Sequence, residues 1–257
     1  MPPIAHIETP FKTKFGVPRQ AGLVDFTARI VFEPDYRVPE AVRGLEDFDY
    51  IWLIWQFHKI SSPLPGSIGD MACDRSGAKL GEVAAQRADG GVCQWSPTVR
   101  PPRLGGNKRV GVFATRSPFR PNPLGLSSVR LLKVEMDAAL GPLLYVSGAD
   151  LVDGTPILDI KPYLPYADSH PDARSGFAAA APPPALAVDD PQGLLDTLSP
   201  DLRRALVDTL AQDPRPHYHD DPDRTYALLF DRYELKFNVI NNKVTITSIV
   251  LTSSACL

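Results

Sequence analysis

Residues 24–32 read VDFTARIVF, and apolar side chains occupy every second position of this run. One side of the run carries only apolar residues, namely Val24, Phe26, Ala28, Ile30 and Phe32. Alternation with a period of two is typical of a β-strand that buries one face and leaves the other in water. The sequence therefore predicts a strand over 24–32 whose apolar face packs on a core.

A second run, at residues 50–57, reads YIWLIWQF and is almost continuously apolar, which predicts a strand buried on both faces. Proline accounts for 27 of the 257 residues, which disfavours long helices because proline cannot donate a backbone hydrogen bond. These features predict a mainly β domain over 1–172, closed as a barrel. Further strands are expected at 109–115, 127–136 and 143–149, and a short helix with Pro39 in its first turn at 39–48.

Two segments differ in composition from the rest. Residues 61–95 are rich in Gly, Ala and Ser, which predicts an extended surface loop with a short helix at 78–87. Residues 173–190, ARSGFAAAAPPPALAVDD, are typical of a linker.

The last part of the chain, 191–257, is expected to form a small α+β C-terminal module. Apolar spacing predicts a helix over 191–212. Two alternating runs, 233–240 and 244–250, are joined by Asn241-Asn242. Asparagine tolerates the positive φ of a tight turn, so this pattern predicts a β-hairpin.

Composition limits the classes of function. The hydrophobic fraction of 44% supports a real core, and the formal net charge of −3 means that any nucleic-acid surface must be a local patch. No apolar run is long enough to span a membrane, and the N-terminus resembles no secretory signal. Three cysteines are too few for a disulfide framework and fit a reducing cytoplasm, although a link between Cys73 and Cys93 stays open.

Positive charge is concentrated in one part of this acidic chain. Between Gly90 and Val134 there is no Asp or Glu, whereas eight positive residues occur there: Arg100, Arg103, Lys108, Arg109, Arg116, Arg120, Arg130 and Lys133. Clustered cations bind polyanions because each phosphate contact releases condensed counterions. The interleaved Pro and Gly residues suit loops that present guanidinium groups. The alternative is a solvated basic loop that serves only solubility.

The common nucleotide and metal motifs are missing. LGGN at 104–107 is not a Rossmann fingerprint, and there is neither a P-loop nor an HExxH motif. The five histidines show no metal-ligand spacing, so no metal is expected.

Several blocks occur together and in order: FGVPRQ (15–20), AVRGLE (41–46), SPTVRPPRLGGN (96–107), GVFATRS (111–117), FRPNPLG (119–125), DLVDGTP (150–156), DIKPYLPY (159–166) and QDPRP (212–216). With these blocks the chain resembles the TrmO/TsaA-like family of tRNA (N6-threonylcarbamoyladenosine(37)-N6)-methyltransferases. The segment 61–95 is longer than the family pattern leads us to expect.

The resemblance implies a β-barrel methyltransferase that works as a homodimer, with S-adenosylmethionine as methyl donor. The acceptor would be tRNA with threonylcarbamoylated adenosine 37. By matching blocks, the implied donor-binding residues are Pro18, Arg19, Gln20, His58, Lys59, Arg116, Leu126, Asp153, Gly154, Thr155 and Pro156. The residues expected to contact RNA are Arg100, Arg103, Lys108, Arg109, Arg120, Asn122 and Arg215.

The residue chemistry suits this assignment. Arg116 can bind the donor carboxylate in bidentate fashion, and Gly154 allows close approach of the backbone. In-line displacement at a sulfonium methyl needs mainly alignment of the reactants, while a proton must leave the acceptor nitrogen. His58 and Asp153 are both candidates for taking that proton. Two alternatives remain: a non-catalytic RNA-binding module, and a methyltransferase of the same fold with another acceptor.

Overall fold

The computed structural model describes residues 1–58, 84–86, 92–94, 96–104, 108–179, 185–215, 221 and 223–252. Lys59, Cys73, most of 61–95 and the last residue of the QDPRP block lie outside them. Contacts divide the chain into two compact units. The first comprises 1–55, 126–171 and 182–257, and the second comprises 56–125 and 172–181.

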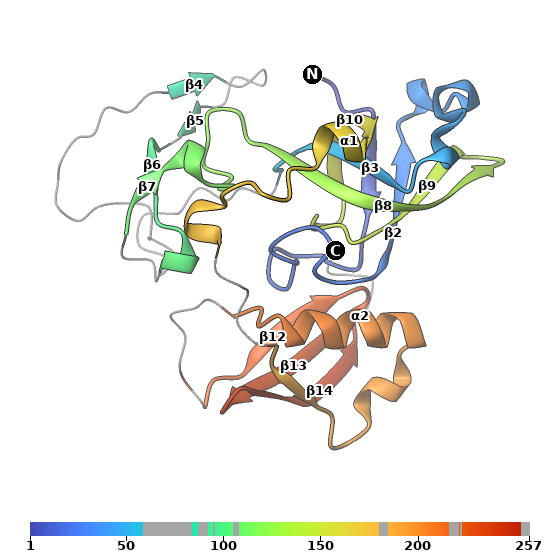
Figure 1. The fold of residues 1–257 in the computed structure, drawn as a ribbon. Coiled ribbons are helices and arrows are strands. Elements are labelled where there is room, and N and C mark those ends of the chain that lie inside the picture. The colour runs from blue at the N-terminus through green and yellow to red at the C-terminus, as the bar shows by residue number, and fades with distance from the viewer. Residues whose placement is uncertain are drawn as a thin grey trace. The chain divides into compact units, whose positions relative to one another are not determined.

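Six strands form a closed barrel in the order β1-β10-β3-β8-β9-β2, with β2 paired to β1 (Figure 1). Closure leaves no unpaired sheet edge, which is one way in which β proteins avoid edge-to-edge association. The prediction of a mainly β barrel is confirmed. The strands are β1 Ala5–Glu8, β2 Thr27–Phe32, β3 Tyr50–Gln56, β8 Leu124–Asp137, β9 Gly141–Ser147 and β10 Thr155–Pro162.

The alternating run at 24–32 behaves as its pattern predicts. Its five alternating apolar side chains are buried, although the regular strand begins only at Thr27. Side chains from other barrel strands are fully buried as well, among them Ile7, Leu53, Leu144 and Ile157. The barrel is therefore filled by aliphatic side chains.

The prediction that 50–57 is buried on both faces is wrong, although the strand itself is present as β3. Ile51, Leu53 and Trp55 are buried, whereas the residues between them are only partly covered. On the outer face, Trp52 packs against Tyr163 with ring centroids 5.6 Å apart, and its indole donates to Asp168 at 2.8 Å. Aromatic residues on this strand thus stand on the outside of the barrel as well as in its core.

The C-terminal module is a four-stranded sheet in the order β11-β14-β13-β12. Its strands are β11 Ala187–Asp189, β12 Tyr226–Phe230, β13 Tyr233–Ile240 and β14 Lys243–Leu251, accompanied by helix α2 Pro200–Ala211 (Figure 1). The Ser199 hydroxyl caps α2 by accepting from the Leu202 amide at 3.4 Å, and Pro200 occupies the first turn. The α+β prediction is confirmed.

Three boundaries differ from the sequence prediction. The expected helix at 191–212 is interrupted at the cap Ser199 and consists of a short 3-10 helix, Leu194–Thr197, followed by α2. The segment 173–190 is not all linker, because its last residues form β11, parallel to β14. The expected helix at 39–48 is two 3-10 helices, Pro39–Val42 and Leu45–Asp47, separated by Gly44 at φ +81°.

The second unit contains short elements. Strands β6 Thr98–Val99 and β7 Val110–Gly111 pair with each other, as do β4 Ala84–Gln86 and β5 Val92–Gln94. Residues 84–86 are therefore strand, not part of the helix expected at 78–87. The strand expected at 109–115 ends at Gly111 and continues as a 3-10 helix, Val112–Ala114. Additional 3-10 turns occur at Pro102–Leu104 and Gly176–Ala178.

One aromatic cluster joins the barrel to the C-terminal sheet inside the first unit. Phe11 is fully buried and packs edge-on against Phe26 and Phe230, with ring centroids 5.0 and 5.4 Å apart. Phe11 also forms an isolated β-bridge with Phe230. In the described part of the chain, no helix is long and apolar enough to cross a membrane.

The predicted hairpin is present, with β13 and β14 joined at Asn241 and Asn242, whose φ angles are 51° and 58°. Two successive positive φ values define a type I′ turn. We expect Asn242→Val to lower the free energy of unfolding by about 1–2 kcal/mol, because a β-branched residue is strained in this conformation. Asn242→Gly should stay within roughly 0.5 kcal/mol of the parent. Urea unfolding measures both, and equal stability of the two variants would contradict the turn assignment.

Candidate functional site

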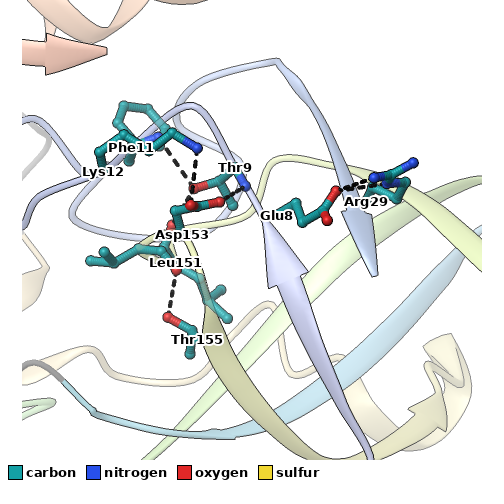
Figure 2. A network of polar contacts seen from close by, with 9 residues as sticks. Glu8, Thr9, Phe11, Lys12, Arg29, Leu151, Asp153 and Thr155 are labelled. Carbon is teal, nitrogen blue, oxygen red and sulfur yellow. Dashed lines mark hydrogen bonds and ion pairs between the residues drawn. The ribbon is translucent and has the colours of Figure 1, made fainter. Parts of the chain in front are cut away.

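The turn Asp153–Pro156 is fixed against the segment that follows β1 (Figure 2). Asp153 Oδ1 accepts from the Thr9 amide at 2.9 Å, and Asp153 Oδ2 lies 2.9 Å from Lys12 Nζ. The Asp153 amide donates to the Phe11 carbonyl at 2.8 Å. Each oxygen of this carboxylate therefore has a donor from the same short segment.

The remaining residues of the turn have distinct positions. The Gly154 amide donates to the Ile7 carbonyl at 2.8 Å, and the Thr155 hydroxyl donates to the Val152 carbonyl at 2.6 Å. Pro156 lies within β10 opposite His6. Gly154 is exposed at φ +74°, and a Cβ added to it would have no atom within 4 Å. The turn thus presents an open backbone face while its base is fixed to the barrel.

Leu126 lies near the start of β8 with an exposed side chain, 56% accessible. Its neighbour Ser127 is buried and accepts from the Trp55 indole at 3.0 Å, while its hydroxyl donates to Asp150 at 2.5 Å. This relay connects β3, β8 and the loop before the Asp153 turn. The relay holds the backbone next to Leu126, while the Leu126 side chain stays exposed to solvent.

The FGVPRQ loop contacts the DPRP block from the far end of the chain. Arg19 Nη2 donates to the Asp213 and Arg215 carbonyls at 3.1 and 3.2 Å. Arg215 in turn forms a bidentate pair with Asp213, with Nε to Oδ1 at 2.8 Å and Nη2 to Oδ2 at 2.9 Å. Pro18 is buried and Gln20 partly covered. The structure therefore brings together two blocks that lie nearly 200 residues apart.

The Asp213–Arg215 pair is partly shielded, with 13% of the Arg215 side chain exposed. Burial alone would raise the pKa of the Asp213 carboxyl, but the hydrogen bonds and charge of Arg215 outweigh burial and hold that pKa below its usual value. A lowered carboxyl pKa contributes stability at neutral pH, and this contribution is lost as the pH falls through the folded-state pKa.

The other predicted donor-binding residues fall in the second unit. His58 is exposed and follows β3. Arg116 is exposed too, and the backbone beside it is fixed: the Thr115 hydroxyl donates to the Val112 carbonyl at 2.8 Å and accepts from the Ser117 amide at 3.2 Å. Arg116 thus projects from an ordered turn.

Several of the predicted RNA-contacting residues also hold their own loops. Arg109 donates to the Thr98 hydroxyl at 2.9 Å, Arg120 to the Thr115 carbonyl at 3.1 Å, and Arg103 to the Ala178 carbonyl at 3.0 Å. Lys108 and Asn122 are exposed, and Arg100 is partly covered. Arg103, Arg109 and Arg120 are therefore held by hydrogen bonds, whereas Lys108 is exposed.

Sequence reasoning missed Lys12, Thr9 and Asp213. Lys12 belongs to none of the recognisable blocks, and Thr9 acts through its backbone amide, so neither carried a sequence signal. Asp213 precedes Pro214 in the DPRP block. An Asp two residues before an Arg is a local pattern from which the ion pair with Arg215 could have been predicted.

The fold indicates the class of protein. The barrel with its attached α+β sheet is similar to a solved TrmO structure, with a TM-score of 0.67, 30% sequence identity and coverage of 97% of both chains. This is the class of β-barrel tRNA methyltransferases. Family models match at both ends: the tRNA-methyltransferase O N-terminal domain over residues 6–169 and the TrmO C-terminal domain over 191–252. The chain belongs to the tRNA-methyltransferase O family.

Similar proteins extend over almost the whole chain. The tRNA (adenine(37)-N6)-methyltransferase of Escherichia coli is 40% identical over 247 residues, which cover 92% of this chain and 91% of that protein. A Pseudomonas aeruginosa relative, named as an S-adenosylmethionine-dependent methyltransferase, RcsF, is 39% identical over 236 residues, 88% of this chain and 86% of its own.

Proposed function

We propose that the protein transfers a methyl group from S-adenosylmethionine to N6 of adenosine 37 in tRNA, and that this adenosine already carries a threonylcarbamoyl group. The observation that carries the proposal is the 40% identity to the Escherichia coli enzyme across both domains. The threonylcarbamoyl group is inferred from the resemblance of the sequence blocks to the TrmO/TsaA-like family.

The described residues fit such a donor. The open face of Gly154 leaves room for a ligand beside the backbone, and Arg116 offers an exposed guanidinium for a carboxylate. When bound, the donor supplies a methyl group on a positively charged sulfur. The residues of this chain would bind and align it. We propose the following set: Pro18, Arg19, Gln20, His58, Lys59, Arg116, Leu126, Asp153, Gly154, Thr155 and Pro156.

We propose His58, rather than Asp153, as the group that accepts a proton from the acceptor nitrogen. The Asp153 carboxylate is engaged by Lys12 and by the Thr9 amide, and protonation would weaken both interactions. His58 is exposed at the end of a strand, and imidazole is well suited to proton transfer near neutral pH.

The proposed RNA surface is the basic part of the second unit, with Arg100, Arg103, Lys108, Arg109, Arg120 and Asn122. Arg215 is also a predicted RNA contact, but most of its side chain is covered and its guanidinium is paired with Asp213. Arg215 therefore offers less of its side chain to phosphate than the exposed Lys108 does.

We expect neutralising one phosphate contact to reduce the slope of log K against log salt by roughly 0.7–0.9. Lys108→Ala is the cleanest variant because Lys108 is exposed. Arg103→Ala tests a second position, and Arg103→Lys, which keeps the charge, should retain the slope. Donor affinity should stay unchanged. The slopes are obtained from tRNA affinities measured at several salt concentrations. Unaltered slopes in Lys108→Ala and Arg103→Ala would mean that the basic residues serve only solubility.

Two measurements separate the alternatives. Calorimetric titration with S-adenosylmethionine tests the alternative that the protein is a non-catalytic RNA-binding module. Such a module would not bind the donor and would show no heat of binding. Methyl transfer to tRNA with and without threonylcarbamoyl at adenosine 37 tests whether the enzyme uses another acceptor.

We propose a homodimer, which sedimentation equilibrium can test, and a cytoplasmic location, suggested by the few cysteines. We further propose that residues 1–172 act as the catalytic domain and 191–257 as an accessory module, and that neither requires a metal.

A further inference from the structure

Lys12 lies outside the predicted donor site, yet it forms an ion pair with a residue of that site. Its Nζ lies 2.9 Å from Asp153 Oδ2, and the two side chains are only 22% and 28% exposed. A partly shielded pair interacts more strongly than a pair fully in water, because less solvent screens it.

The backbone of Lys12 is fixed by its neighbours. Phe11 is fully buried between Phe26 and Phe230, so the chain enters Lys12 from the core. The Thr9 hydroxyl donates to the Leu151 carbonyl at 3.2 Å and accepts from the Phe11 amide at 3.2 Å. Figure 2 shows Lys12 and Thr9 both directed at Asp153. The ammonium group of Lys12 is therefore held beside Asp153 by an ordered backbone.

The ion pair and the open face belong to the same turn. Lys12 and Thr9 engage the Asp153 side chain, whereas the exposed Gly154 has free space where a side chain would stand. Glycine adopts positive φ as readily as negative φ, so Gly154 does not itself fix the shape of the turn, which depends on contacts of its neighbours. The ion pair between Lys12 and Asp153 is one such contact.

We infer that Lys12 is a positioning residue of the donor site. By holding the Asp153 carboxylate, it keeps the turn Asp153–Pro156 in the shape that receives S-adenosylmethionine, without contacting the donor itself. This inference rests on the proposed function, since it assigns Lys12 to the proposed donor turn. It also gives Asp153 a structural task in place of proton transfer.

Calorimetry with S-adenosylmethionine tests the inference on the full chain. We expect Lys12→Met to weaken donor affinity roughly 3- to 10-fold, as the loss of one charge-assisted contact would. Lys12→Arg should recover affinity to within about twofold of the parent, because arginine can also donate to Asp153. tRNA affinity should stay unchanged in both variants.

A double-mutant cycle distinguishes positioning from direct binding. If Lys12 acts through Asp153, Lys12→Met should have little further effect on donor affinity in the Asp153→Asn background. Additive losses would overturn the inference, because they would mean that Lys12 contacts the donor. Hydrogen exchange supplies a readout without donor: the amides of Gly154 and Thr155 should exchange faster in Lys12→Met.

Lys243→Met is the matched control, since it removes an ion pair of similar length, 2.8 Å to Asp189, in the C-terminal sheet. It should leave donor affinity and the exchange of Gly154 unchanged. If the parent protein binds no donor, the proposed function fails. If the parent binds donor and Lys12→Met binds it equally well, the inference about Lys12 fails alone. Should Lys12→Met not fold, Lys12→Gln replaces it.

Discussion

Replacing Gly154 with valine is expected to weaken S-adenosylmethionine binding by at least tenfold, about 1.4 kcal/mol or more. Strain and steric exclusion act on different quantities. The φ of +74° is strained for a β-branched residue, which costs about 1–2 kcal/mol of folding free energy. The new side chain would also occupy the open space beside the turn, which we propose receives the donor. Calorimetry measures the affinity, and thermal unfolding measures the strain.

The chain offers a matched control for this backbone strain. Gly44 has a similar φ of +81° and equally open surroundings, but it separates two 3-10 helices and is not one of the predicted donor residues. Gly44→Val should therefore lower stability and leave donor affinity intact. Asn is tolerated at positive φ, so Gly154→Asn separates steric exclusion from strain. Normal donor affinity in Gly154→Val would remove the turn from the donor site.

Removing the guanidinium of Arg116 should have a comparable or larger effect. A charge-assisted pair with the donor carboxylate is worth about 1.5–3 kcal/mol, so Arg116→Ala should lose roughly 10- to 150-fold in donor affinity. Folding should be preserved because the side chain is exposed and the hydrogen bonds of Thr115 hold the turn. Arg116→Lys keeps the charge but not the bidentate geometry, and an intermediate loss is expected.

Arg174→Ala serves as the control for loss of a surface arginine in the same unit, since Arg174 is exposed and outside the predicted site. It should bind donor as the parent does. Equal affinities of Arg116→Ala and Arg174→Ala, both folded, would exclude Arg116 from donor binding.

The parts of the fold with a strong local pattern could be predicted. The alternation at 24–32 and the Asn241-Asn242 turn each impose a conformation through nearby residues, and both are present. Strands without such a pattern were not predicted. β1 has only four residues and includes His6 and Glu8, and β10 contains two prolines and a bulge after Ile157.

The burial of β3 shows a different limit. Trp52 and Ile54 are as apolar as the core residues beside them, so hydrophobicity alone could not tell the outer face from the inner one. Their surroundings are set by partners distant in sequence, such as Tyr163 and Asp168. Only the closed barrel defines which face is inside.

Where side-chain identity carries the chemistry, the sequence suggests site residues, and Arg116 and Gly154 stay predictions of this kind. The candidate site was not predictable where backbone groups act. Arg19 donates to the carbonyls of Asp213 and Arg215, and Asp153 accepts from the Thr9 amide. Backbone carbonyls and amides occur at almost every residue and leave no mark in the sequence.

Mass spectrometry of tRNA nucleosides tests the central claim most directly. The protein is incubated with S-adenosylmethionine that carries an isotopically labelled methyl group, and with tRNA that has or lacks threonylcarbamoyl at adenosine 37. We predict one labelled methyl group on N6 of threonylcarbamoyladenosine, and no label in the tRNA that lacks this modification. Label in any other nucleoside, or no label in either tRNA, would contradict the proposed function.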